Sequence, residues 1–223
     1  MRIVKPNNFK KSEIFLLVLI YLILILNALF FKDSAVAFVY AFFGITYTIF
    51  AGKGLPICYL FGVTGSGFYS YLAFHNALWG NLILYMGYYI PMQILGFLRW
   101  QKHLKAESAE IVKIKLSAKE FLIILAVTLI ICVLTIAVLF YMKDKSPFID
   151  GITTVLSLTG MYLTVRRAIE QWIFWMVVNG LSAIMWINIA LSGEKVYSTV
   201  IMWCVYFVLA IYFYINWKKD LKE

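Results

Sequence analysis

The residues of this sequence whose types and spacing could do chemistry are neutral amides and aromatic rings inside apolar segments. Trp172, Trp175, Asn179 and Trp186 follow one another at intervals of three, four and seven residues. On an α-helix these intervals place all four side chains on one face. Trp172 also fits the aromatic belt found at membrane surfaces. Asn179 lies about two helical turns further into apolar surroundings, where a buried amide needs a partner, either a ligand or a neighbouring helix.

A second group of such residues surrounds a proline. Asn81, Tyr89 and Gln93 lie within one apolar segment, together with Pro91. Proline has no backbone N–H, so the carbonyl one turn earlier loses its helical partner. A kink beside Gln93 would make a binding feature, although a proline that is simply tolerated in a membrane helix fits the pattern equally well.

The apolar segments contain no Asp, Glu, Lys, Arg or His, and Asp150 lies at the end of one of them. An intramembrane enzyme needs a general base or a metal near its reaction, and proton relays use ionisable groups inside the membrane. Cys58, Cys132 and Cys204 are far apart and provide neither a disulfide framework nor a metal-ligand spacing. We therefore expect no enzyme activity, no metal, no cofactor and no proton coupling, while sodium coupling through backbone carbonyls stays open.

Composition indicates the class of protein. Of the 223 residues, 63% are hydrophobic and 14% charged, and the mean hydropathy is +0.86. Soluble domains average about 45–50% apolar and about 25% charged residues. The apolar runs are long and show no strand-like alternation, so we expect an all-α protein of the lipid bilayer rather than a barrel. The net charge of +9 does not indicate nucleic-acid binding, because the basic residues lie between the apolar runs.

Apolar runs bounded by charged or turn residues predict eight transmembrane helices. Their approximate bounds are 14–31, 35–51, 55–74, 78–98, 121–142, 148–165, 172–191 and 196–215. With these spans, sixteen of the 20 Lys and Arg residues lie on one side of the membrane and four on the other. By the positive-inside rule we expect both termini in the cytoplasm.

A faint internal repeat relates the second to fourth spans to the sixth to eighth. At an offset of 117 residues, Trp100 aligns with Trp217 and Tyr89 with Tyr206. The intervening fifth span keeps the two three-helix units parallel, as in transporters that bind substrate between such repeats. The expected organisation is a tail and extra helix over 1–33, a first repeat over 34–102, a cytoplasmic linker and connecting helix over 103–146, and a second repeat with a basic tail over 147–223.

Two stretches of the sequence resemble the PnuC family of bacterial vitamin transporters. They are Trp172-x-x-Trp175-x-x-x-Asn179 and Pro91-Met92-Gln93-x-x-Gly96-x-x-x-Trp100, and the resemblance extends over nearly the whole chain. It implies a fold similar to that of the SWEET sugar transporters, a 3+1+3 arrangement preceded by one extra helix. It also implies a homotrimer in the bacterial cytoplasmic membrane that works by facilitated diffusion.

Carried over residue by residue, the resemblance predicts which side chains bind the substrate. The matches are Trp175, Asn179 and Gln93, with Trp172, Trp186, Asn81 and Tyr89 as looser ones.

The resemblance implies a vitamin substrate, of which nicotinamide riboside is the best known, while relatives carry thiamine, riboflavin or deoxynucleosides. Nicotinamide riboside has a permanently cationic ring that Trp and Tyr faces can hold, and an amide and hydroxyls that Asn and Gln can bond. Thiamine is cationic too, and Asn at position 179 favours the riboside. A cytosolic kinase would then trap the product. A non-transporting membrane scaffold or an enzyme is the competing class.

Overall fold

The structure is a computed structural model that describes residues 9, 11–31, 35–75, 79–143, 146–193 and 197–222. Helices make up nearly all of this part of the chain, and the β-type pairing in it is limited to two isolated bridges. The elements are α1 (Lys11–Phe31), α2 (Ala35–Gly52), α3 (Cys58–His75), α4 (Trp79–Leu84), the π-helix η2 (Tyr85–Tyr89), α5 (Ile90–Gln101), α6 (Ala118–Tyr141), α7 (Pro147–Val165), α8 (Gln171–Leu191) and α9 (Tyr197–Asp220). The expected all-α fold is confirmed for the described residues.

The helices overlap the apolar runs of the sequence, and the fourth run is divided among α4, η2 and α5. Within the described residues, four helical stretches are long and apolar enough to cross a membrane: Ala118–Tyr141, Pro147–Val165, Gln171–Leu191 and Thr199–Asp220. Two shorter apolar helical stretches are Glu13–Leu26 and Phe38–Gly52. These stretches expose many large hydrophobic side chains, which is the composition of a lipid-facing surface.

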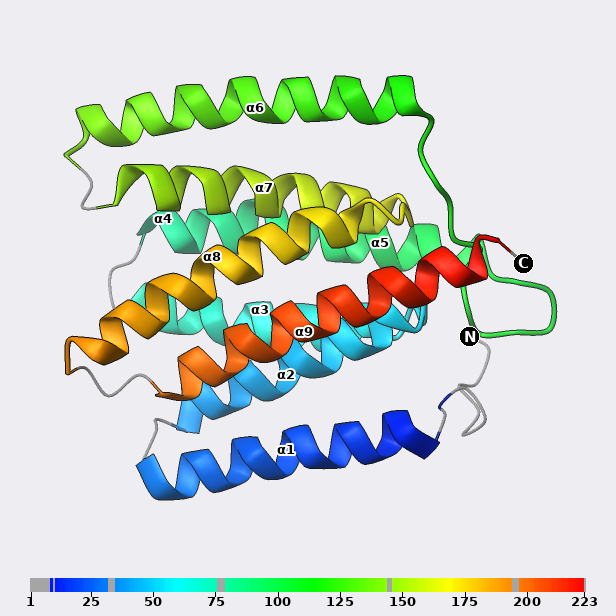
Figure 1. Cartoon of the computed structure of the whole chain (residues 1–223), viewed down its shortest axis with the longest axis horizontal. Coiled ribbons are helices and arrows are strands. Elements are labelled where there is room, and N and C mark those ends of the chain that lie inside the picture. The colour runs from blue at the N-terminus through cyan, green and yellow to red at the C-terminus, as the bar shows by residue number, and fades with distance from the viewer. Residues whose placement is uncertain are drawn as a thin grey trace.

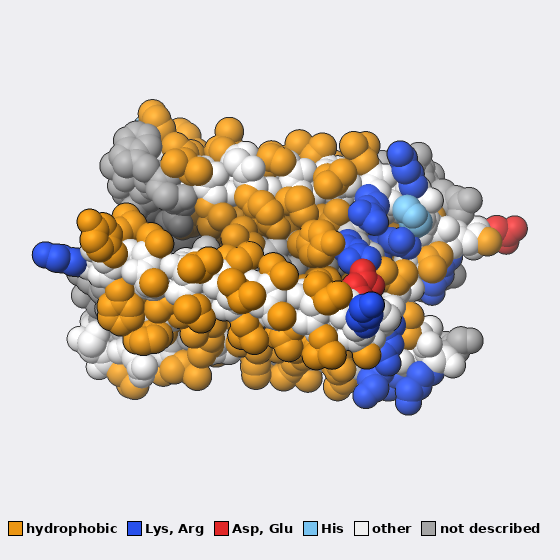
Figure 2. All heavy atoms as spheres, turned by 90° about the horizontal axis from the view of Figure 1, so that it is seen from above, with side chains coloured by type: hydrophobic (Ala, Val, Ile, Leu, Met, Phe, Trp, Pro, Cys, Tyr) orange, Lys and Arg blue, Asp and Glu red, His pale blue; other side chains and the backbone are white. Residues whose placement is uncertain are grey.

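The helices run side by side, with α1 along one edge of the molecule and α6 along the opposite edge (Figure 1). Helix α1 packs against α2 and α9, and α6 packs against α7. Basic side chains gather at one end of the bundle (Figure 2), which we call the basic end; it includes Lys53, Arg99, Lys113, Arg166 and Lys218. The other end, where α2 and α7 begin, is called the opposite end.

The segment between α5 and α6 is an ordered strap across the basic end. The backbone N–H of Ile111 donates to the carbonyl of Gly54 at 2.9 Å, in the turn between α2 and α3. The N–H of Ile114 donates to the carbonyl of Arg167 at 3.0 Å, in the turn between α7 and α8. The strap therefore ties the two turns together, although its polar composition alone suggests only a solvated linker.

Lys113 of the strap lies against the end of α9. Its ammonium is 5.1 Å from the centroid of the Trp217 ring and forms an ion pair with Asp220. Burial lowers the pKa of Lys113, and the neighbouring carboxylate opposes this shift. The contact fixes the strap to α9 as well as to the two turns.

Two buried tryptophans join the two halves of the bundle, of which one is formed by α2 to α5 and the other by α7 to α9. Trp100, at the end of α5, donates its indole N–H to the carbonyl of Thr164 in the last turn of α7, at 2.9 Å. Trp217, near the end of α9, donates to the carbonyl of Gly52 in the last turn of α2, at 2.6 Å. The last carbonyls of a helix lack partners within it, so each tryptophan supplies one. These are the two residues that align at an offset of 117.

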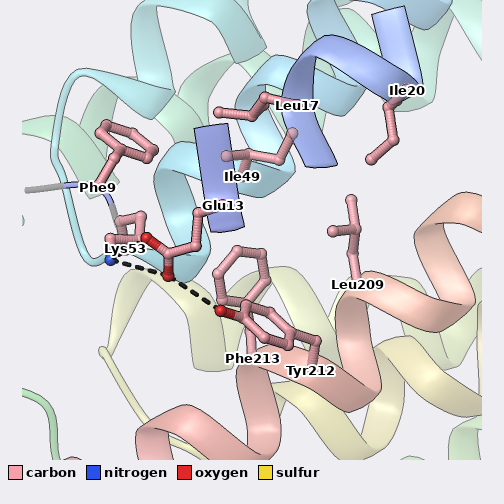
Figure 3. Close-up of a pocket in the computed structure, with 9 residues that line it drawn as sticks. All are labelled: Phe9, Glu13, Leu17, Ile20, Ile49, Lys53, Leu209, Tyr212 and Phe213. Atoms are coloured by element: carbon pink, nitrogen blue, oxygen red, sulfur yellow. Dashed lines mark hydrogen bonds and ion pairs between the residues drawn. The ribbon is translucent and has the colours of Figure 1, made fainter. Parts of the chain in front are cut away.

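Helix α1 is attached to the bundle through Glu13, which is 8% exposed. The ammonium of Lys53 lies 3.0 Å from its carboxylate, and the hydroxyl of Tyr212 donates to it at 3.0 Å (Figure 3). The cavity beside these groups has about 20 Å³, enough for a single water molecule. This region anchors α1 and is too small for an organic ligand.

Candidate functional site

A cavity of about 460 Å³ lies between the two halves of the bundle. Residues of α2 to α5 and of α7 to α9 line it, and no described residue of α1 or α6 takes part. Its lining extends from Asp150, in the first turn of α7, to Thr164 and Gln171 near the basic end. At 1.5 Å per residue, the stretch from Asp150 to Thr164 is about 21 Å long. This volume is typical of sites for small organic molecules.

Gln93 reaches the cavity from α5 and is 6% exposed. Its amide nitrogen donates to the hydroxyl of Ser66 on α3 at 3.1 Å. A Cβ atom at Gly62 would lie 3.1 Å from the Gln93 amide carbon and 2.8 Å from the Tyr47 ring. A glycine at position 62 therefore gives the amide the room it needs beside α3.

The helix before Gln93 is distorted where the sequence contains a proline. Residues Tyr85–Tyr89 form the π-helix η2, and Pro91 is at the start of α5. A proline cannot donate a helical hydrogen bond, and π-type turns are found at such places and often at functional sites. The wider turn directs Tyr89 to the cavity, where its hydroxyl donates to Ser157 of α7 at 2.9 Å.

Trp175 forms part of the cavity wall on α8. Its indole N–H donates to the hydroxyl of Thr164 at 3.2 Å. A Cβ atom at Gly160 would lie 3.0 Å from the indole, so the ring packs closely on α7. The ring is partly exposed and lines the cavity, and its orientation is set by both contacts.

Asn179 lies one turn after Trp175, lines the cavity and is 6% exposed. Its amide makes no hydrogen bond to another residue in the described part of the chain. An amide that joins two helices would be bonded to the neighbouring helix. Buried polar groups nearly always have a partner, so this amide is available to a ligand in the cavity.

Of the other residues singled out from the sequence, Tyr89, Trp172 and Trp186 can be placed in the structure. Tyr89 and Trp172 line the cavity, but Trp172 is 2% exposed and packs against Phe213 and Trp217, with ring centroids 5.5 and 5.8 Å away. Trp172 is therefore part of the packed layer that closes the cavity towards the basic end. Trp186 does not line the cavity. The side chain of Asn81 lies outside the described residues.

Helix α7 contributes a polar stripe that sequence reasoning missed. Asp150, Thr153, Thr154, Ser157 and Thr164 all line the cavity from this helix. Thr153 and Thr154 are adjacent, and the other intervals are three, four or seven residues, so the five share one broad helical face. That spacing is visible in the sequence and could have predicted a helix with a polar, cavity-facing side.

The charge of the described lining is simple. Asp150 is its single charged residue, and it contains neither Lys nor Arg. Its other polar groups are neutral amides and hydroxyls, set among Tyr and Trp rings. Such a lining can hold an organic cation through aromatic faces, whereas an anion would find no positive charge there.

Comparison with known proteins identifies the family. A family model described as nicotinamide mononucleotide transporter matches residues 34–219. A nicotinamide riboside transporter PnuC from Neisseria mucosa is 33% identical over 196 residues, which cover 86% of this chain and 74% of that protein. The chain belongs to the PnuC family of transporters.

Further comparisons agree with PnuC membership. The nicotinamide riboside transporter PnuC from Haemophilus influenzae is 28% identical over 195 residues, covering 86% of this chain and 82% of that protein. The crystal structure of the vitamin B3 transporter PnuC matches with a TM-score of 0.82 and 30% identity, over 96% of this chain and 93% of the other. The present chain belongs to a family of transporters and has several apolar helices. It is therefore a multi-pass membrane transporter and not an enzyme.

Proposed function

We propose that this chain transports nicotinamide riboside and that the central cavity is its substrate site. The observation that carries the proposal is the Asn179 amide, which is buried beside a large cavity and has no hydrogen-bond partner in the described protein. A hydrogen bond to such an amide contributes about 0.5–1.5 kcal/mol net, so a ligand that bonds to it gains affinity. The curated relatives at 33% and 28% identity carry the same substrate name.

The groups around Asn179 suit the chemistry of this substrate. The face of Trp175 can hold the cationic pyridinium ring by a cation–π contact. Amides such as Gln93 and Asn179 can donate and accept, so they match both the carboxamide and the ribose hydroxyls. Tyr89 lines the side of the proposed site, and Trp172 lines its closed end towards the basic end of the bundle.

The charge of the cavity favours the riboside over the mononucleotide that the family description names. The mononucleotide carries a phosphate, which proteins usually bind with Arg, Lys or helix N-termini. The described lining contains neither Lys nor Arg, so a phosphate would find no cationic side chain among those residues. Thiamine, which is also a cation, is the first alternative substrate, and riboflavin and deoxynucleosides are further alternatives.

We also propose eight transmembrane spans in which α2, α3 and α5 form one parallel repeat and α7, α8 and α9 the other. The paired crossings support this arrangement, because Trp100 bonds the end of α7 and Trp217 bonds the end of α2. Exchanging the two repeats converts one contact into the other. The basic end would face the cytoplasm of a bacterium, with both termini on that side.

Transport would be facilitated diffusion, because the described lining contains one carboxylate, Asp150, and no His, Glu, Lys or Arg, the groups that proton relays use. Net uptake would then depend on a cytosolic kinase that phosphorylates the product, since the phosphorylated form is anionic and does not fit the cavity. Assembly as a homotrimer is proposed from the family resemblance alone.

Calorimetry with purified protein tests the proposed substrate. We expect nicotinamide riboside to bind in the micromolar range, and nicotinamide mononucleotide, thiamine and riboflavin to bind more weakly. Failure of all four ligands to bind would overturn the proposal, and tighter binding of thiamine would change the substrate. Uptake into sealed liposomes should stop at equal concentrations, so sustained accumulation driven by a proton or sodium gradient would contradict facilitated diffusion.

A further inference from the structure

The two turns at the basic end, one between α2 and α3 and the other between α7 and α8, have the same backbone structure. In the first turn, the N–H of Gly54 donates to the carbonyl of Ala51 at 2.9 Å. In the second, the N–H of Arg167 donates to the carbonyl of Thr164, also at 2.9 Å. The matching residues are 113 positions apart, and the other backbone bonds of the two turns agree at the same offset. Gly54 and Arg167 therefore occupy equivalent positions in the two repeats.

The strap bonds this equivalent position in both turns. The N–H of Ile111 donates to the Gly54 carbonyl, and the N–H of Ile114 donates to the Arg167 carbonyl. Ile111 and Ile114 are three positions apart, and three residues extend over at most about 11 Å. The two turns therefore cannot move further apart at the basic end while both bonds persist (Figure 1).

Arg167 has a backbone conformation that favours glycine. Its φ is +66°, close to the +69° of Gly54, and a residue with a Cβ atom rarely adopts such an angle. The guanidinium group of Arg167 donates to the carbonyl of Val112 in the strap at 2.7 Å, and the residue is buried. Strained backbone persists where the surrounding contacts hold it, and it is frequent in segments that switch. The contact with the strap, and not the turn, therefore accounts for an arginine here.

Four buried rings close the cavity towards the basic end, and we call them the aromatic layer. Tyr59 packs on Trp100 with ring centroids 5.0 Å apart, and Trp172 packs on Trp217 at 5.8 Å. Tyr59 and Trp172 are again 113 positions apart, so each repeat supplies one equivalent pair. Ile111 of the strap belongs to the same hydrophobic cluster. The strap and the aromatic layer are therefore packed together.

Several polar groups in and beside the aromatic layer have no partner. The hydroxyl of Tyr59 and the indole N–H of Trp172 are buried and make no hydrogen bond within the described chain. The same holds for the amide nitrogen of Gln171. Buried polar groups without partners destabilise the arrangement that buries them, and water that enters the layer would supply those partners. Contacts outside the layer must therefore help to keep it closed.

We propose that the strap is a latch that keeps the cavity closed at the basic end, and that Arg167 is the residue that positions it. The inference rests on the proposed function, because transport through the cavity requires this end to open. Transporters built from two repeats open by moving one repeat against the other around a central site. Release of the strap from one turn lets the repeats separate at the basic end. The aromatic layer then divides between the Tyr59–Trp100 pair and the Trp172–Trp217 pair.

Thiol labelling of the full-length protein in detergent tests the latch, with Cys58 as the reporter. Cys58 precedes Tyr59 at the start of α3, is fully buried and belongs to the same cluster as the aromatic layer. Its reaction with a sulfonated maleimide, followed by mass spectrometry, should report the fraction of molecules in which the layer is open. We expect Arg167→Gly to speed this reaction about 2- to 12-fold, the factor that one net hydrogen bond contributes to an equilibrium. The Tm should change little, because glycine relieves the positive φ.

A second variant and two controls separate the latch from other effects. Ile114→Pro removes the N–H that bonds the Arg167 carbonyl, and should also speed the labelling of Cys58. Lys115→Pro is its matched control, because the N–H of this exposed residue makes no hydrogen bond in the described chain. Arg166→Gln removes the same charge next to Arg167, but from a side chain that pairs with Glu120 of α6. Both controls should label as the wild type does.

Labelling of Cys132 distinguishes opening of the aromatic layer from unfolding. Cys132 is buried on α6, outside the layer, and should react equally slowly in every variant. Faster labelling of Cys58 and Cys132 together would mean a general loosening of the fold and would overturn the latch. Equal labelling of Cys58 in the wild type, Arg167→Gly and Ile114→Pro would overturn it as well. The labelling needs no riboside, so a wild type that binds none in calorimetry would overturn the proposed substrate and not the latch.

Discussion

Removing the Asn179 amide should weaken substrate binding without weakening the fold. The side chain lines the cavity, and its amide has no hydrogen-bond partner in the described chain, so Asn179→Ala breaks no bond within the protein. A bound ligand that loses its partner at this position forfeits about 1–3 kcal/mol. At about 1.4 kcal/mol per factor of ten, the Kd for nicotinamide riboside should rise about 5- to 150-fold.

Two measurements on the same detergent-solubilised protein check this prediction. Calorimetry gives the Kd, and thermal unfolding gives the Tm, which should change little. Asn188→Ala is the matched control, because Asn188 lies on the same helix, is exposed and does not line the cavity. That variant should bind as the wild type does.

Two results would refute the reasoning about Asn179. A lower Tm with an unchanged Kd would mean that the amide joins helices and does not bind substrate. An unchanged Kd and an unchanged Tm would place the binding site elsewhere in the bundle.

Three further predictions concern the ring, the glycine and the crossing tryptophans. Trp175→Ala removes a cation–π face that contributes about 0.5–2 kcal/mol. The riboside Kd should therefore rise about 2- to 30-fold in the same calorimetric titration. An unchanged Kd would exclude the Trp175 ring from the site. Gly62→Ala places a methyl group 2.8 Å from the Tyr47 ring and 3.1 Å from the Gln93 amide carbon. Such overpacking costs about 1–3 kcal/mol of stability, so the Tm should fall, and displacement of Gln93 should raise the riboside Kd. Gly67→Ala, with open space around it, should change neither value. Trp100→Phe and Trp217→Phe each remove one buried hydrogen bond of about 0.5–1.5 kcal/mol and should lower the Tm by similar amounts with little change in Kd. Clearly unequal losses of stability would argue against equivalent repeats.

Much of the architecture follows from local sequence features. Long apolar runs separated by basic turns predict helices, and the observed helices overlap those runs closely. The expected distortion near Pro91 occurs as the π-helix before it, because the missing N–H is a property of the residue itself. These features depend on neighbours within about one helical turn, which is the range that sequence patterns report.

The candidate site was predictable only in part. Spacing correctly put Trp175 and Asn179 on one face of α8, and Gln93 lines the same cavity from α5. The same spacing also selected Trp186, which does not line the cavity. Periodicity tells which residues share a face, but the packing of other helices decides how much of that face remains open.

What the sequence by itself determined is the helical membrane class, the approximate helix bounds and a short set of amide and aromatic candidates. Only the tertiary structure decided which helices enclose the cavity with the polar face of α7, that Trp172 is packed against Phe213 and Trp217, and that Trp100 and Trp217 bond the opposite repeat. The physical reason is that these contacts join residues more than 40 positions apart. Local propensity and periodicity carry no information about which distant segment will pack against a given helix face.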